Sequence, residues 1–233
     1  MIGKHAAFTG LLITIFGLAP ALAQNQAPVS PPPVIHPIGF FVTSKTPTSS
    51  GNLGGLAGAD KICQDLAAAA GAGGRTWHAY LSTQPTQASP GEDARDRIGS
   101  GPWYNAKNIL IAANVNDLHG DIRRDSNNIQ KRTALTEKGD AIKAVGDVPA
   151  PPSTIEHDIL TGSDSEGRAF PAGLDTTCDN WTSDNDDHKA MLGHADRSGG
   201  GISWNSVHIS RGCSAAKLDE SGGAGLLYCF AVR

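Results

Sequence analysis

The sequence of 233 residues is long enough for one domain of ordinary size with a buried core. Hydrophobic residues make up 39% and charged residues 18%, and the 28 glycines and 14 prolines indicate a loop-rich fold rather than a helical bundle. The formal net charge of −4 argues against binding to nucleic acid or sulfated polysaccharides, because these polyanions require clustered lysines and arginines.

The first 23 residues have the pattern of a secretory signal peptide. Lys4 provides the positive end, residues 6–18 are almost uninterrupted apolar sequence, and Ala21-Leu22-Ala23 is an A-x-A cleavage site. A membrane anchor is the alternative, but the apolar run is too short to span a bilayer. We therefore expect a secreted or periplasmic protein that is not inserted in a membrane after cleavage. The alanine- and glycine-rich composition suggests a bacterial source.

Residues 24–37 are proline-rich and predict an extended linker with no fold of its own, so the folded domain is expected over residues 38–233. Its best-defined part is a helix over residues 59–70, where apolar side chains recur at helical spacing. Asp60 is expected in the first turn, where a carboxylate suits the positive end of the helix dipole. Glycines lead into this helix and end it.

The other predicted elements are short. The predicted strands cover residues 38–44, 77–82, 127–134, 137–145, 176–182, 202–209 and 222–232, and one more begins at Ile159. Residues 91–98 predict a short helix, and the apolar run 109–113 predicts a buried strand or one helical turn. Residues 99–105 and 115–125 are expected to be a turn and a polar loop. The pattern as a whole predicts an α+β domain.

All four cysteines follow the predicted signal peptide, at Cys63, Cys178, Cys213 and Cys229. An even number in an exported chain predicts two disulfides, and spacing alone does not choose among the three possible pairings. A cysteine-based zinc site is the alternative, but the sequence has no C-x-x-C spacing.

Two stretches of the chain carry family-like motifs. The first holds Gly58-Ala59-Asp60, then Cys63, then Ala79-Tyr80-Leu81-Ser82, and the second holds Gly162-Ser163-Asp164, Gly167-Arg168 and Cys178-Asp179-Asn180-Trp181-Thr182. In these motifs the sequence resembles the endostatin domain of the type XV and XVIII collagens. The resemblance covers most of the chain from about residue 38, except residues 83–150.

This resemblance implies a C-type-lectin-like fold with one main helix on short mixed strands. It also implies two nested disulfides, Cys63 with Cys229 and Cys178 with Cys213. Calcium-dependent lectins of this fold carry Glu-Pro-Asn or Gln-Pro-Asp and Trp-Asn-Asp triplets, whereas this chain has only Trp204-Asn205-Ser206. A calcium-based sugar site in the usual position is therefore not expected, and neither heparin binding nor N-terminal zinc binding carries over.

Aromatic and polar side chains in the second half are the candidate ligand-binding residues, because aromatic faces stack on sugars while amides and carboxylates hold hydroxyls. They are Trp204, Asn205, His208, Trp181, Asp184 and Asn185. The carboxylates of Asp184, Asp186 and Asp187 are close in sequence and could bind a hard cation such as Ca²⁺. For the aspartates the alternative is a solvated acidic loop. For Trp181 a place in the core is favoured, and for Trp204 the core and contact with a ligand both stay open. No cofactor is otherwise expected.

The sequence thus predicts an exported, non-catalytic, lectin-like module whose partner is a carbohydrate or surface glycan. A structural or protein-interaction module, with an extracellular protein as partner, is the first alternative. A metal-dependent hydrolase, with His188 and His194 beside Asp186, Asp187 and Asp196, is the second.

Overall fold

The computed structural model describes residues 1–3, 32–119, 127–147 and 155–232. It divides into two units, Met1–Val34 and Ile35–Arg233, and every helix and strand described below lies in the second. The predicted signal peptide and linker lie almost wholly outside the described residues. None of the helices in the described ranges is long and apolar enough to cross a membrane.

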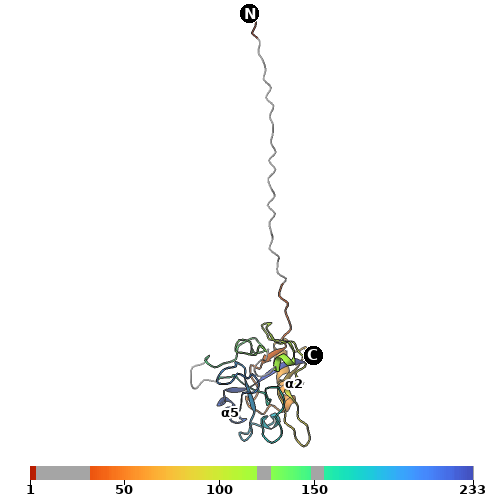
Figure 1. The fold of residues 1–233 in the computed structure, drawn as a ribbon, viewed down its shortest axis with the longest axis vertical. Helices are drawn as coiled ribbons and strands as arrows, with labels where there is room; N and C mark the ends of the chain where they lie inside the picture. The colour runs from red at the N-terminus through yellow and green to blue at the C-terminus, as the bar shows by residue number, and fades with distance from the viewer. Residues whose placement is uncertain (4–31, 120–126, 148–154, 233) are drawn as a thin grey trace. The chain divides into compact units, whose positions relative to one another are not determined.

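The domain is a mixed α+β structure, as the sequence predicts, with long loops around a central sheet (Figure 1). The six strands of this sheet are β1 (Phe40–Val42), β2 (Thr76–Ala79), β5 (Asp158–Leu160), β6 (Met191–His194), β7 (His208–Ile209) and β8 (Gly223–Val232). The long strand β8 pairs antiparallel with β1 and β2 and parallel with β5, and β6 and β7 then extend the sheet to an edge. A second sheet pairs β3 (Trp103–Tyr104) with β4 (Leu110–Ala112).

Strand β8 separates two hydrophobic cores. Its alternate residues Leu226, Tyr228 and Phe230 belong to one core, and Leu227, Cys229 and Ala231 belong to the other. Successive side chains of a strand point to opposite faces, so a strand buried on both faces has a continuous apolar run. This is why residues 222–232 are so hydrophobic and why the sequence predicts this strand correctly.

Five helices occur in the described part of the chain. They are α1 (Gly55–Ala69), α2 (Ala94–Arg97), α3 (Val115–His119), α4 (Cys178–Trp181) and α5 (Ala215–Asp219). Only α1 is long, and it packs the buried stripe Ala59, Cys63 and Ala67 into the core that holds Cys229. The disulfide pairing implied by the family resemblance is confirmed, because Cys63 is bonded to Cys229 and Cys178 to Cys213.

The expected role of Asp60 is corrected by the structure. Helix α1 begins at Gly55, with Gly54 in a left-handed conformation before it, so Asp60 is not in the first turn. Its carboxylate instead accepts two hydrogen bonds from Arg97, at 2.7 and 2.8 Å, and one from the backbone of Ala79 at 2.9 Å. Asp60 therefore joins α1 to α2 and β2.

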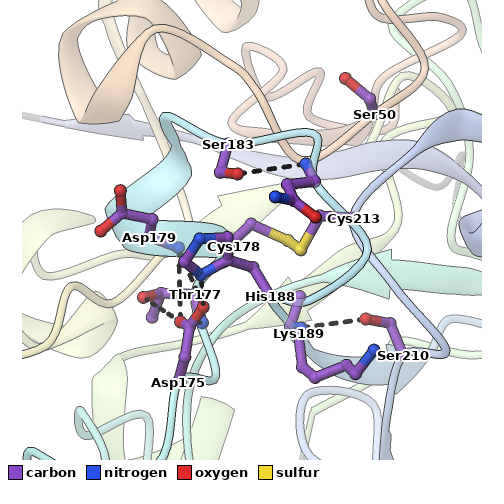
Figure 2. The surroundings of a disulfide bond; sticks show 12 residues. Ser50, Asp175, Thr177, Cys178, Asp179, Ser183, His188, Lys189, Ser210 and Cys213 are labelled. Atoms are coloured by element: carbon purple, nitrogen blue, oxygen red, sulfur yellow. Dashed lines mark hydrogen bonds and ion pairs between the residues drawn. A yellow bond between two sulfur atoms is a disulfide. The ribbon is translucent and has the colours of Figure 1, made fainter.

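The predicted strand over residues 176–182 is wrong. The residues Cys178, Asp179, Asn180 and Trp181 all have positive φ, between 49° and 68°, and form a left-handed turn beside the Cys178–Cys213 disulfide (Figure 2). Side chains with a Cβ disfavour this region by about 1–2 kcal/mol per residue, so other contacts must hold the turn. Asp175 accepts a hydrogen bond from Thr177 N, and Trp181 Nε1 donates to the carbonyl of Ser82.

Other short elements also differ from expectation. Residues 127–134 and 137–145 form no strand in the described chain and make only isolated bridges, such as Leu135 with Ala141. The expected polar loop 115–125 begins with helix α3, and the expected turn 99–105 contains strand β3. Of the predicted strand 202–209, only the last two residues form a strand, β7. Elements of two to five residues are too short to show a clear hydrophobic period.

Candidate functional site

A cavity of about 280 Å³ lies under the segment 200–207, where the sequence predicts ligand binding. The other residues that line it are His119, Ser165 and Arg197. Two of the predicted ligand residues, Trp204 and Asn205, belong to this lining, whereas Trp181, His208, Asp184 and Asn185 do not.

Trp204 contributes to the cavity wall, but its side chain lies in the hydrophobic core. Its side chain is only 1% exposed, and its ring packs against Tyr80 and Tyr228 with centroid distances of 4.8 and 5.3 Å. Its carbonyl accepts a hydrogen bond from the hydroxyl of Tyr228 at 2.8 Å. The expectation of an accessible ring that stacks on a sugar is therefore corrected. Trp181 is likewise fully buried, as the sequence interpretation favoured.

Asn205 is also buried, and it fixes the shape of the cavity wall. Its side-chain amide donates to the hydroxyl of Tyr80 at 2.9 Å and to the carbonyls of Asp164 and Ser165 at 3.1 and 3.2 Å. Its side-chain oxygen accepts a hydrogen bond from the Ser203 hydroxyl at 3.0 Å. Because both ends of the amide are used inside the protein, Asn205 positions the segment that a ligand would contact.

A buried pair of titratable side chains, His119 in the lining and Tyr80 next to it, belongs to this wall. The Nδ1–H of His119 donates to the carbonyl of Val115, so its Nε2 accepts the hydroxyl proton of Tyr80 at 2.8 Å. Burial lowers the pKa of His119 to about 4, and burial raises the pKa of Tyr80 far above its usual value. Both side chains are therefore neutral near pH 7, and this wall offers hydrogen bonds rather than proton transfer.

We predict that the domain loses stability as the pH falls from 6.5 to 4 because of His119. The unfolded histidine, with its pKa near 6.5, binds a proton in this window, whereas the folded histidine does so only near pH 4. The lost stability is about 3 kcal/mol. Denaturant unfolding at a series of pH values measures it, and His119→Gln should flatten the dependence. An equal slope in both proteins would contradict the prediction.

The predicted cation loop lies away from this cavity and is exposed. Asp184, Asn185, Asp186 and Asp187 all face solvent. Asp186 accepts a hydrogen bond from Ser214 N, which holds the pKa of its carboxyl below the usual value, and Asn185 accepts one from Asp187 N. Within the described ranges, three or more potential ligand atoms come together only at His157, Asp158 and His194, so the three aspartates form no such group.

The histidines of the predicted hydrolase centre are separated. His188 Nδ1 is 2.8 Å from the carboxylate of Asp175, close to the Cys178–Cys213 disulfide (Figure 2). Burial raises the pKa of Asp175, but the backbone N–H of Thr177 and the His188 imidazole outweigh it and hold the pKa below its usual value. His194 lies instead beside Asp158 and His208, and Asp196 is paired with His157.

His157 and Asp158 were not among the candidates from the sequence. Asp158 is the first residue of β5 and lies directly opposite His194 of β6, and His157 immediately precedes the strand. The adjacent pair His157-Asp158 before an apolar run was the only local signal. Its significance depends on strand register, which brings in partners far along the chain.

The chain matches no protein-family model and no curated protein.

Proposed function

We propose that this protein is an exported, non-catalytic binding module of the endostatin-like and C-type-lectin-like fold, and that it binds a carbohydrate or surface glycan in the cavity under residues 200–207. The cavity itself is the observation that carries this proposal, since about 280 Å³ suits one small ring rather than a large ligand. The two disulfides support an oxidising, extracellular type of environment.

The chemistry of the lining supports a neutral polyol as ligand. Ser165 and Ser206 bring hydroxyl groups and the backbone of 200–202 brings peptide groups, all of which can bond sugar hydroxyls, whereas the Ser203 hydroxyl is used by Asn205 and Ser206 N. Ile202 also lines the cavity, and with 68% of its surface exposed it offers an apolar face to the C–H side of a ring. Arg197 donates hydrogen bonds to the carbonyl of Ile129 and to the side-chain oxygen of Asn127, and these bonds fix its position in the cavity wall.

Replacing Ile202 with alanine is expected to weaken glycan binding about fivefold to tenfold, because the lost methyl and methylene groups remove apolar contact with the ring. Binding is measured first on a glycan array with the oxidised protein, with calcium and with chelator, and then by titration of the best glycan. Binding that does not depend on chelator is the expected result.

Leu174→Ala is the matched control, because Leu174 is 59% exposed and does not line the cavity. It should bind like the unmodified protein. Equal losses in both variants would contradict the assignment of the cavity.

A protein-interaction module is the second candidate. Ile209 on the edge strand β7 is 37% exposed, and Ile202 is more exposed still. Edge strands with apolar side chains can pair with a strand of another chain. Absence of glycan binding in every condition would favour this candidate.

A further inference from the structure

Three histidines surround one buried aspartate where β5, β6 and β7 lie side by side. The carboxylate of Asp158 has Oδ1 at 3.2 Å from His157 Nε2 and 3.1 Å from His194 Nε2, and Oδ2 at 3.4 Å from His208 Nε2. His194 Nε2 and His208 Nε2 are themselves 3.2 Å apart. Ligand atoms of His157, Asp158 and His194 thus all lie within 4.8 Å of one another, and His208 adds a nitrogen beside Asp158 and His194.

In two of these rings, His157 and His194, the Nδ1 atom lies within hydrogen-bonding distance of an acceptor whose position is fixed. His157 Nδ1 is 2.9 Å from the carboxylate of Asp196, and His194 Nδ1 is 3.0 Å from the carbonyl of Gly201. These acceptors hold the proton on Nδ1, so in each neutral ring Nε2 carries a lone pair. Both lone pairs then face Asp158 Oδ1, which is also an acceptor.

Asp158 itself has unmet bonding capacity. Its side chain is 0% exposed, yet among the described residues neither of its oxygens receives a hydrogen bond of good geometry. The histidine nitrogens are at ion-pair distance but not in hydrogen-bonding directions. A buried carboxylate without donors is costly, so the arrangement calls for a cation at its centre.

We propose that His157, Asp158, His194 and His208 bind a zinc ion. Zinc takes four nitrogen or oxygen ligands at about 2.0–2.2 Å in a tetrahedron, whose ligand atoms are then about 3.3–3.5 Å apart. Asp158 Oδ1 is 3.2 Å from His157 Nε2 and 3.1 Å from His194 Nε2, and His194 and His208 are 3.2 Å apart, all close to this spacing; His208 approaches the other oxygen, Oδ2, at 3.4 Å. Asp196 and Gly201 supply the outer hydrogen bonds that orient metal-binding histidines.

The site has a path for the ion. Another cavity, of about 350 Å³, is lined by His157, His194 and His208 together with Gly199 and Gly222. Asp219 and Glu220 also line it; the charge of Asp219 favours entry of a cation, whereas Glu220 is paired with Lys217. The Cβ of any side chain at Gly222 would lie 3.2 Å from His157 Nε2 and 3.3 Å from Asp158 Oδ2, so a larger residue there would crowd the ligands.

A zinc ion with four protein ligands has no open coordination position, which is typical of a structural rather than a catalytic zinc site. The ion would join the start of β5 to β6 and to β7, which is only two residues long and lies at the edge of the sheet. This role does not depend on the glycan cavity, because none of the four ligands lines it.

The test is a titration of Zn²⁺ into the purified, oxidised, chelator-treated protein near pH 7, followed by calorimetry. Co²⁺ is then used as a spectroscopic substitute, since its visible bands report tetrahedral nitrogen and oxygen ligation. We expect one Zn²⁺ per chain, a higher thermal midpoint with Zn²⁺, and tetrahedral Co²⁺ bands. His208→Gln should weaken binding by about tenfold or more.

His188→Gln is the matched control, because the side chains of His188 and His208 are 36% and 40% exposed and both contact an aspartate. It should bind Zn²⁺ like the unmodified protein. The proposal is overturned if the unmodified protein binds no Zn²⁺. It is also overturned if His188→Gln loses as much affinity as His208→Gln. Both variants alter partly exposed side chains, so neither test depends on a change in the core.

Discussion

Replacing Gly193 with alanine is expected to destabilise the domain by about 3–5 kcal/mol or to prevent folding. Gly193 lies in the middle of β6, and a Cβ there would collide with the carbonyl of Trp204 and approach Asn205 Cα to 2.5 Å. These are backbone atoms, so no side-chain rotation relieves the overlap. The segment that forms the cavity wall would have to move away from the sheet.

Denaturant unfolding of Gly193→Ala measures the effect, with Gly74→Ala as the control. A Cβ at Gly74 meets nothing within 4 Å, and Gly74 does not have positive φ. The control should be within about 1 kcal/mol of the unmodified protein. Similar stability of the two variants would mean that the approach of Trp204 to β6 does not hold in solution.

Removing the Cys63–Cys229 disulfide by a double change to alanine is expected to cost about 5 kcal/mol, and removing Cys178–Cys213 about 4 kcal/mol. The difference follows from the lengths of chain that the bridges close, with sequence separations of 166 and 35. A longer closed loop restricts the unfolded chain more. The second loss should be smaller still, because the strained left-handed turn at Cys178 can relax once its bridge is gone.

The measurement is urea unfolding of the two double variants under oxidising conditions. A greater loss from the shorter bridge would contradict the loop-length argument, and it would show that the left-handed turn depends on its disulfide more than on Asp175 and Thr177.

The sequence predicts most reliably the elements whose burial leaves a pattern. Strand β8 is buried on both faces and reads as an apolar run, and α1 buries Ala59, Cys63 and Ala67 at helical spacing. The left-handed turn at residues 178–181 could not be predicted, because partners such as Gln84 and Ser82 that hold it lie far away in the chain. Aromatic and threonine residues there instead suggested a strand.

The candidate sites show the same limit. Trp204 was a candidate for stacking on a sugar, but its ring is held in the core by Tyr80 and Tyr228. The histidine cluster depends on the pairing of Asp158 with His194 in β5 and β6 and on the position of β7. Strand order and register decide which histidines lie next to one another, and neither can be predicted from a short stretch of sequence.

The central position of β8 has a consequence for how this protein is made. β8 follows every other strand in chain order, and its backbone at Leu227 bonds Thr43 across a separation of 184 residues. The sheet can therefore assemble only after residue 232 has been synthesised, and contacts of such long range form slowly. Until then the native partner of Cys63 is missing, while Cys178 and Cys213 are already present. Early oxidation would therefore form non-native disulfides between Cys63 and one of them. Folding of this domain should therefore depend on an enzyme that reshuffles disulfides.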